Sequence, residues 1–101
     1  MKVHEMQMDQ IEWSSYLIGF RTNVFIEADP DMSKDDLIIM QETVNHKAKK
    51  TGRNIAFRII GIDMSVGVYE DMVIWNVELK RLKQYIYPSN EGLMSIANAG
   101  D

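Results

Sequence analysis

The sequence predicts a single small α+β domain in which one main helix packs on an antiparallel-rich sheet, in the order β-α-β-β. The 101 residues are 46% hydrophobic and 26% charged, the balance of one globular domain, and no repeat or linker divides residues 1–101. Alternating apolar residues indicate strands, and one stripe at helical spacing indicates a helix between them. Residues 1–13 and 89–101 show no clear period, so we expect loosely defined ends.

The first predicted strand covers residues 16–28. Hydrophobic or small residues stand at every second position and are expected to face the core: Ile18, Phe20, Thr22, Val24, Ile26 and Ala28. Residues such as Arg21 and Glu27 then face water. Before this strand, residues 2–8 resemble an edge strand in their composition, and we expect Trp13 to pack on the core.

The predicted helix covers residues 34–50. Pro30 ends the preceding strand and Ser33 is the expected N-cap. Asp35 and Asp36 lie in the first turn, where the helix dipole favours acids. Gly52 is the expected stop signal. The buried stripe comprises Leu37, Met40, Val44 and Ala48, and the basic residues of the last turn are Lys47, Lys49 and Lys50.

Two further strands are predicted after this helix. Residues 54–63 are rich in β-branched and aromatic side chains and are bounded by turn-forming residues. Residues 72–87 fit two patterns, because their apolar side chains alternate and also follow helical spacing. The β-branched residues Val73, Ile74 and Val77 favour a strand. The core-facing residues of this strand are then Val73, Trp75, Val77 and Leu79.

Few residues point to catalysis or to a metal. The chain has no cysteine, which excludes thiolate nucleophiles and Cys-ligated metals, and its six glycines are scattered singly rather than grouped in a phosphate-binding loop. Asp29, Asp31 and Ser33 have the spacing of a calcium loop, but Lys34 and Met40 stand where glycine and glutamate are required. We therefore expect no metal site, no cofactor and no enzymatic activity, with an unadvertised carboxylate or histidine site as the less favoured reading.

Charge and aromatic residues provide the candidate binding site. The net charge is −4, but two basic clusters stand out, the second followed by tyrosines. The candidate binding residues are Lys49, Lys50 and Arg53 in the first cluster and Lys80, Arg81, Lys83, Tyr85 and Tyr87 in the second. Cations beside aromatic rings suit phosphates and stacked bases. Because the chain as a whole is acidic, nucleic acid is the less favoured partner and another protein the favoured one.

These observations predict a non-enzymatic interaction module, such as a small inhibitor or accessory subunit that acts by protein–protein contact. The alternative is an oligomer that binds a small ligand or nucleotide in a pocket between subunits. We also expect a homodimer formed through an exposed strand at 16–28 or 72–80. The start of the chain lacks the apolar centre of a signal peptide, and no apolar run reaches the length of a bilayer span, so a cytoplasmic location without membrane contact is expected.

Overall fold

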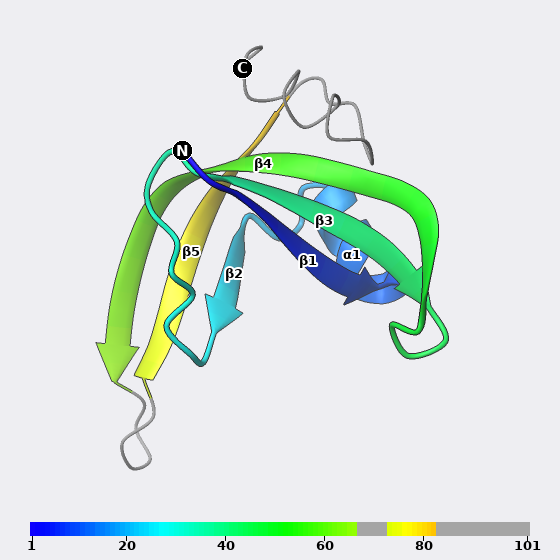
Figure 1. Cartoon of the computed structure of the whole chain (residues 1–101), viewed down its shortest axis with the longest axis horizontal. Helices are drawn as coiled ribbons and strands as arrows, with labels where there is room; N and C mark the ends of the chain where they lie inside the picture. The colour runs from blue at the N-terminus through cyan, green and yellow to red at the C-terminus, as the bar shows by residue number, and fades with distance from the viewer. Residues whose placement is uncertain (67–72, 83–101) are drawn as a thin grey trace.

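The computed structural model describes residues 1–66 and 73–82 of the chain. This part is a small compact domain with one helix and a curled mixed sheet of five strands (Figure 1). In chain order the elements are β1 (Val3–Asp9), α1 (Gln10–Leu17), β2 (Asn23–Ile26), β3 (Leu37–Val44), β4 (Lys49–Val66) and β5 (Val73–Arg81).

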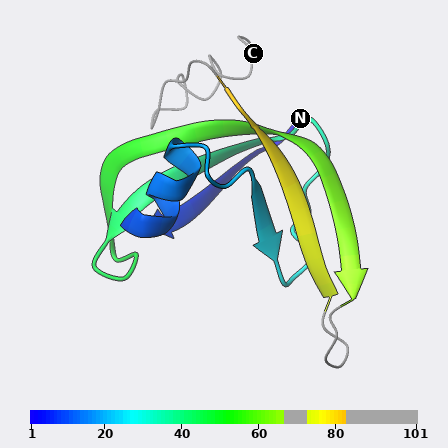
Figure 2. The same cartoon turned by 180° about the vertical axis from the view of Figure 1, so that it is seen from behind.

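The sheet has the strand order β1-β3-β4-β5-β2, so β1 and β2 are its two edges. Strand β1 runs parallel to β3, whereas the other three pairings are antiparallel, which confirms an antiparallel-rich sheet. Register shifts interrupt the β3–β4 pairing between Gln41 and Thr43 and the β4–β5 pairing between Ile59 and Gly61. Such irregularities increase the bend of a strand. Strand β4 arches over the domain, and α1 lies inside the bend (Figure 2).

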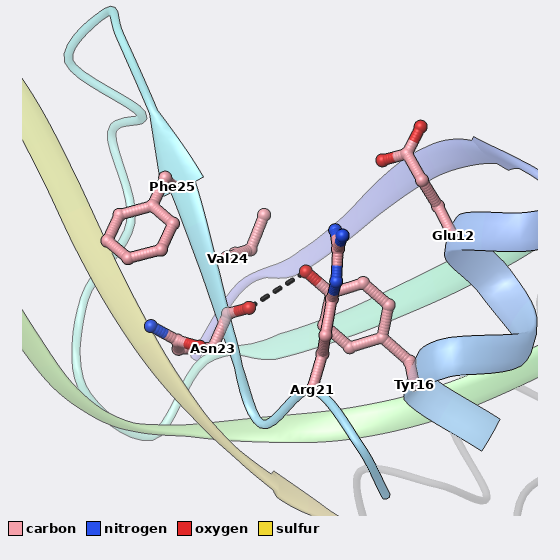
Figure 3. A pocket seen from close by; sticks show the side chains of 6 residues that line it. All are labelled: Glu12, Tyr16, Arg21, Asn23, Val24 and Phe25. Carbon is pink, nitrogen blue, oxygen red and sulfur yellow. Dashed lines mark hydrogen bonds between the residues drawn. The ribbon is translucent and has the colours of Figure 1, made fainter. Parts of the chain in front are cut away.

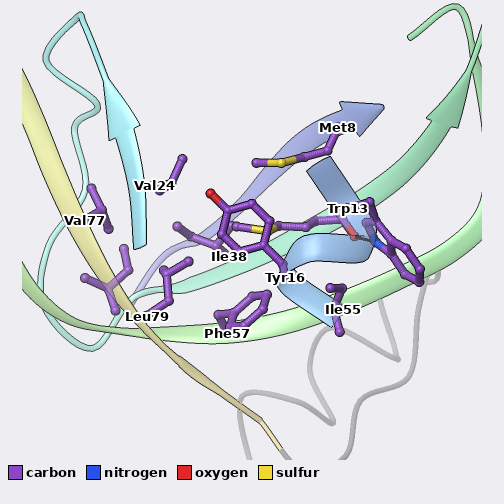
Figure 4. Close-up of a cluster of buried hydrophobic side chains, with 11 residues drawn as sticks. Met8, Trp13, Tyr16, Val24, Ile38, Ile55, Phe57, Val77 and Leu79 are labelled. Carbon is purple, nitrogen blue, oxygen red and sulfur yellow. Dashed lines mark hydrogen bonds between the residues drawn. The ribbon is translucent and has the colours of Figure 1, made fainter. Parts of the chain in front are cut away.

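The core lies between α1 and the concave face of the sheet (Figure 4). Trp13 is only 2% exposed and donates its indole N–H to the carbonyl of Met40 at 3.0 Å, which confirms that this residue packs on the core. The ring of Tyr16 meets that of Phe57 edge-on, with the centroids 6.1 Å apart. The buried cluster comprises Met8, Trp13, Tyr16, Val24, Ile38, Met40, Ile55, Phe57, Ile59, Val77 and Leu79.

The predicted helix at 34–50 is wrong, because these residues form β3, a turn and the start of β4. Every residue from Leu37 to Thr43 is buried, so both faces of β3 are covered and no alternation is visible in the sequence. The helical spacing of its apolar residues is therefore coincidental. The turn that follows contains Asn45, His46 and Lys47, all with positive φ, a conformation that a right-handed helix excludes.

Ser33 is not a helix cap, because it lies in the loop before β3. The capping group in this loop is the carboxylate of Asp36, whose side chain is 6% exposed. It accepts hydrogen bonds from the backbone N–H of Lys2 at 2.9 Å and of Ser33 at 3.0 Å, and Nε2 of His4 lies 2.9 Å away. Burial alone would raise the pKa of Asp36, but these hydrogen bonds outweigh it and lower the pKa to about 2. Asp36 therefore fastens the loop to the start of β1.

The predicted strand at 16–28 is correct only for residues 23–26, because α1 occupies residues 10–17. Asp9 provides the N-cap of α1 by accepting the backbone N–H of Glu12 at 2.8 Å. Gly19, with φ 79°, reverses the chain after the helix. As a result Ile18 and Phe20 are 76% and 80% exposed, instead of facing the core as predicted.

The two later strands are confirmed. Strand β4 contains the predicted residues 54–63 and extends beyond them at both ends. Of the predicted residues 72–87, residues 73–81 form β5, whereas residues 72 and 83–87 lie outside the described residues. Val77 and Leu79 are buried and Glu78 and Lys80 are exposed, which confirms the strand over the helix for residues 73–81, although Val73 and Trp75 are only half-buried. The predicted dimer contact at 72–80 does not fit this arrangement, because β5 pairs with β4 on one side and with β2 on the other.

Candidate binding site at the edge of strand β2

A pocket of about 450 Å³ lies between α1 and β2 (Figure 3). Its lining residues are Glu12 and Tyr16 from α1, Arg21 from the connection, and Asn23, Val24 and Phe25 from β2. The turn after α1 creates this arrangement, because the backbone N–H of Gly19 donates to the carbonyl of Tyr16 and that of Arg21 donates to the carbonyl of Ser15. The chain thereby enters β2 alongside the helix it has just left.

Tyr16 joins the helix to the strand across the base of this pocket. Its phenolic O–H donates to the backbone carbonyl of Asn23 at 2.8 Å (Figure 3). Burial raises the pKa of the Tyr16 phenol, although the nearby Arg21 guanidinium opposes the shift. The phenol therefore remains a hydrogen-bond donor at neutral pH and holds the two walls of the pocket together.

The outer edge of β2, with which no strand pairs within residues 1–66 and 73–82, forms one wall of the pocket. Leu79 N–H donates to the carbonyl of Thr22 at 2.9 Å, which makes Thr22 and Leu79 a hydrogen-bonded pair of the antiparallel ladder. Because such pairs alternate, Asn23 and Phe25 turn their backbone N–H and C=O groups away from β5. Tyr16 uses the Asn23 carbonyl, so Phe25 presents one donor and one acceptor at this edge.

The opposite side of the pocket carries charges. Glu12 supplies carboxylate oxygens from α1, and Arg21 supplies a guanidinium with several fixed donors. The exposed ring of Phe20 precedes Arg21 in the chain. The ring of Phe25 and the side chain of Val24 lie on opposite sides of β2 (Figure 3). The pocket thus combines a charged donor and a charged acceptor with neutral backbone donors and acceptors.

Two of the predicted binding residues lie beside this site. Arg81 donates from Nη1 to the carbonyl of Leu17 at 2.7 Å, and so caps the C-terminal end of α1. Lys80 is its exposed neighbour at the end of β5 and lies opposite Arg58 on β4. The structure therefore places the start of the second basic cluster next to the segment that carries Arg21.

The first basic cluster lies at the other end of β4 and is paired with acids. Lys50 Nζ is 2.5 Å from a carboxylate oxygen of Glu5, and the Arg53 guanidinium lies 4.5 Å from the centre of the Trp13 ring and 3.5 Å from Glu42. Lys49 is exposed in the same segment. Residues 50 and 58 of β4 are separated by roughly 25 Å at the rise of an extended strand. The two clusters therefore do not form one surface.

The remaining predicted site residues, Lys83, Tyr85 and Tyr87, lie outside the described residues. Sequence reasoning did not select Glu12, Tyr16 or Arg21, because it placed residues 16–28 in one strand. The available signal was Gly19 followed by an aromatic and a basic residue, which is typical of a turn that presents side chains to solvent.

No protein-family model and no curated protein sequence matches this chain. Among residues 1–66 and 73–82, no three His, Asp or Glu side chains are grouped as metal ligands. In the same residues no helix has the length and apolar character needed to cross a membrane.

Proposed function

We propose that the protein is a non-enzymatic interaction module, and that the pocket between α1 and β2 binds a planar hydrogen-bonding group such as a nucleobase. The alternative predicted from the sequence placed a nucleotide pocket between subunits; here the proposed pocket belongs to one chain. The observation that carries the proposal is that Phe25, whose backbone N–H and C=O point away from β5 by the alternation of the ladder, lines the same pocket as Arg21 and Glu12.

The shape and chemistry of the pocket support this ligand class. A volume of about 450 Å³ lies in the range of small-molecule sites, which spans roughly 300 to 1,000 Å³. The edge of a nucleobase carries neighbouring donors and acceptors, which match the N–H and C=O of an unpaired strand residue. Glu12 and Arg21 can then read the remaining polar atoms, since one accepts and the other donates hydrogen bonds.

The surroundings of the pocket favour a nucleotide within a single strand over a free base. Exposed Phe20 offers a ring on which a neighbouring base can stack, and base–aromatic stacking contributes about 1–3 kcal/mol per base. Lys80 and Arg81 provide positive charge for phosphates at the adjoining end of β5. Single-stranded nucleic acid is accordingly the occupant that best fits the local chemistry, despite the net charge of −4.

A titration of fluorescently labelled single-stranded oligonucleotides, read by anisotropy, tests this proposal. We expect Arg21→Ala to weaken binding at least tenfold and Glu12→Gln to change the preference among homopolymers, while Lys49→Ala leaves both unchanged. Double-stranded oligonucleotides of the same sequence should bind more weakly, because their base edges are paired. Equal affinity of the wild type and Arg21→Ala, or no binding at low salt, would refute the proposal.

A second candidate is contact with another protein, which the sequence favoured. The supporting observation is that Ile11, Ile18 and Phe20 on and beside α1 are 76–85% exposed, and exposed large apolar side chains within one short segment are a feature of protein interfaces. Replacing Ile11 and Ile18 together by serine separates the two candidates. The double variant should retain oligonucleotide binding if the pocket is the functional site, and should lose a co-purifying protein if the interface is.

A further inference from the structure

In the part of the chain that the structure describes, no strand pairs with the outer side of β1, which makes this strand a second and longer free edge of the sheet. It has seven residues, whereas β2 at the opposite edge has four and is partly occupied by Tyr16. Leu37 N–H donates to the carbonyl of Lys2 at 3.0 Å, which fixes the phase of the parallel β1–β3 ladder. Because successive residues of a strand direct their backbone groups to opposite sides, the even-numbered residues of β1 bond to β3. The backbone N–H and C=O groups of Val3, Glu5 and Gln7 therefore point away from β3.

The side chains along this edge offer little protection against pairing. Val3, Glu5 and Gln7 are exposed on one face of β1, while the even-numbered residues face the core side. Natural edge strands commonly block pairing with proline, lysine or a bulge. Within Val3–Asp9 there is neither proline nor lysine, and the central charge, Glu5, is paired with Lys50 at 2.5 Å.

We propose that two copies of the chain pair antiparallel through β1 about a two-fold axis, so that two five-stranded sheets become one continuous sheet. Two-fold pairing is the commonest closed arrangement of identical chains. The proposal does not depend on the ligand of the β2 pocket. It moves the predicted self-association from 16–28 or 72–80 to β1, because β5 lies inside the sheet and the four-residue edge strand β2 is partly occupied by Tyr16.

One register satisfies both the backbone and the side chains. A two-fold axis at Met6 aligns Val3–Asp9 of one copy along its full length with the same residues of the other. Residues with outward backbone groups then meet each other, with Glu5 opposite the second copy's Gln7. An axis at Glu5 would shorten the overlap and place the Glu5 carboxylates of the two copies opposite each other, which is unfavourable.

Analytical ultracentrifugation of wild type, Gln7→Lys and Gln7→Glu tests this register. Gln7→Lys creates two opposite-charge pairs with Glu5 in the dimer, and Gln7→Glu creates two like-charge pairs. Cross-strand pairs of this kind correspond to roughly two- to thirty-fold changes when two act together. We therefore expect the dimer dissociation constant to fall about fivefold for Gln7→Lys and to rise about fivefold for Gln7→Glu.

The same two substitutions at exposed Ser65, at the far end of β4, serve as matched controls and should leave the dissociation constant unchanged. Because Gln7 is exposed, the variants should keep the circular dichroism spectrum of the wild type. A wild-type mass of 11.7 kDa at every concentration up to 0.5 mM would overturn the proposal. A dimer dissociation constant that is the same for wild type, Gln7→Lys and Gln7→Glu would also overturn the proposal. Arg21→Ala should leave the mass unchanged, which separates this result from failure of the β2 pocket.

Discussion

Protonation of Asp36 should remove a defined part of the stability at low pH. In the folded chain the pKa of Asp36 is lowered from 3.8 to about 2, because hydrogen bonds from His4, Lys2 and Ser33 outweigh the effect of burial. A pKa that is lower in the folded state stabilises the fold above the unfolded pKa and loses that contribution as the pH falls. The shift corresponds to about 2 kcal/mol at neutral pH, most of which is lost between pH 5 and pH 2.

Urea denaturation of wild type and Asp36→Asn at a series of pH values measures this contribution. The difference in unfolding free energy between the two proteins should shrink by about 2 kcal/mol from pH 5 to pH 2, since the variant has no carboxylate to protonate. Asp31→Asn is the matched control, because Asp31 lies in the same loop with its side chain 89% exposed. A wild-type curve that stays parallel to the Asp36→Asn curve over this range would refute the assignment of Asp36 as the fastening group.

Substitutions at three further positions test other parts of the structure by urea denaturation. Gly52→Ala should cost about 1 kcal/mol, because φ is 93° there while no atom lies within 4 Å of the added Cβ, and Gly52→Asn should cost less. Arg53→Ala should cost about 2 kcal/mol, because it removes the cation from Trp13 and leaves the 4% exposed Glu42 carboxylate without its guanidinium. Tyr16→Phe should lower the free energy of unfolding by about 1 kcal/mol through loss of the hydrogen bond to the Asn23 carbonyl, and should weaken the binding of a ligand in the β2 pocket.

Controls for these substitutions come from neighbouring positions. Lys49→Ala changes an exposed cation near Arg53 and should alter stability by less than about 0.5 kcal/mol. A cost for Arg53→Ala no larger than this would contradict the role assigned to the Glu42 pair. An increase in stability on Gly52→Ala would contradict the left-handed conformation at that turn.

The parts of the fold that could be predicted are those whose two faces differ in environment. In β5, residues 77–80 alternate between buried and exposed side chains, and the β-branched residues of this segment decided correctly between strand and helix. The same reasoning fails for β3 because this strand is buried on both faces and its side chains show no alternation. The spacing of its apolar residues therefore matches a helix as well as a strand. Its neighbours in the sheet, which lie far away in sequence, determine its structure.

The candidate site was missed because α1 is short. With eight residues, it buries only Trp13 and Tyr16, a spacing too brief to reveal a helical period. Because residues 16–17 end a helix, Arg21 lies in the connection that follows and Phe25 lies in a short edge strand. A single strand over residues 16–28 would not place these two residues around a pocket. The position of Lys80 and Arg81 beside Arg21 depends on the β2–β5 pairing, and no local pattern predicts such a long-range contact.

The parallel pairing of β1 with β3 also sets the order in which the chain can assemble. Lys2 reaches Asp36 across 34 residues, whereas β3, β4 and β5 follow one another as antiparallel neighbours. Closing a long loop costs entropy before any contact compensates for it, so nearby strands pair first. Strand β1 is synthesised before β3, so its apolar residues Met6 and Met8 have no partner strand until β3 has formed. Substitutions in β1 should consequently accelerate unfolding and leave the folding rate almost unchanged.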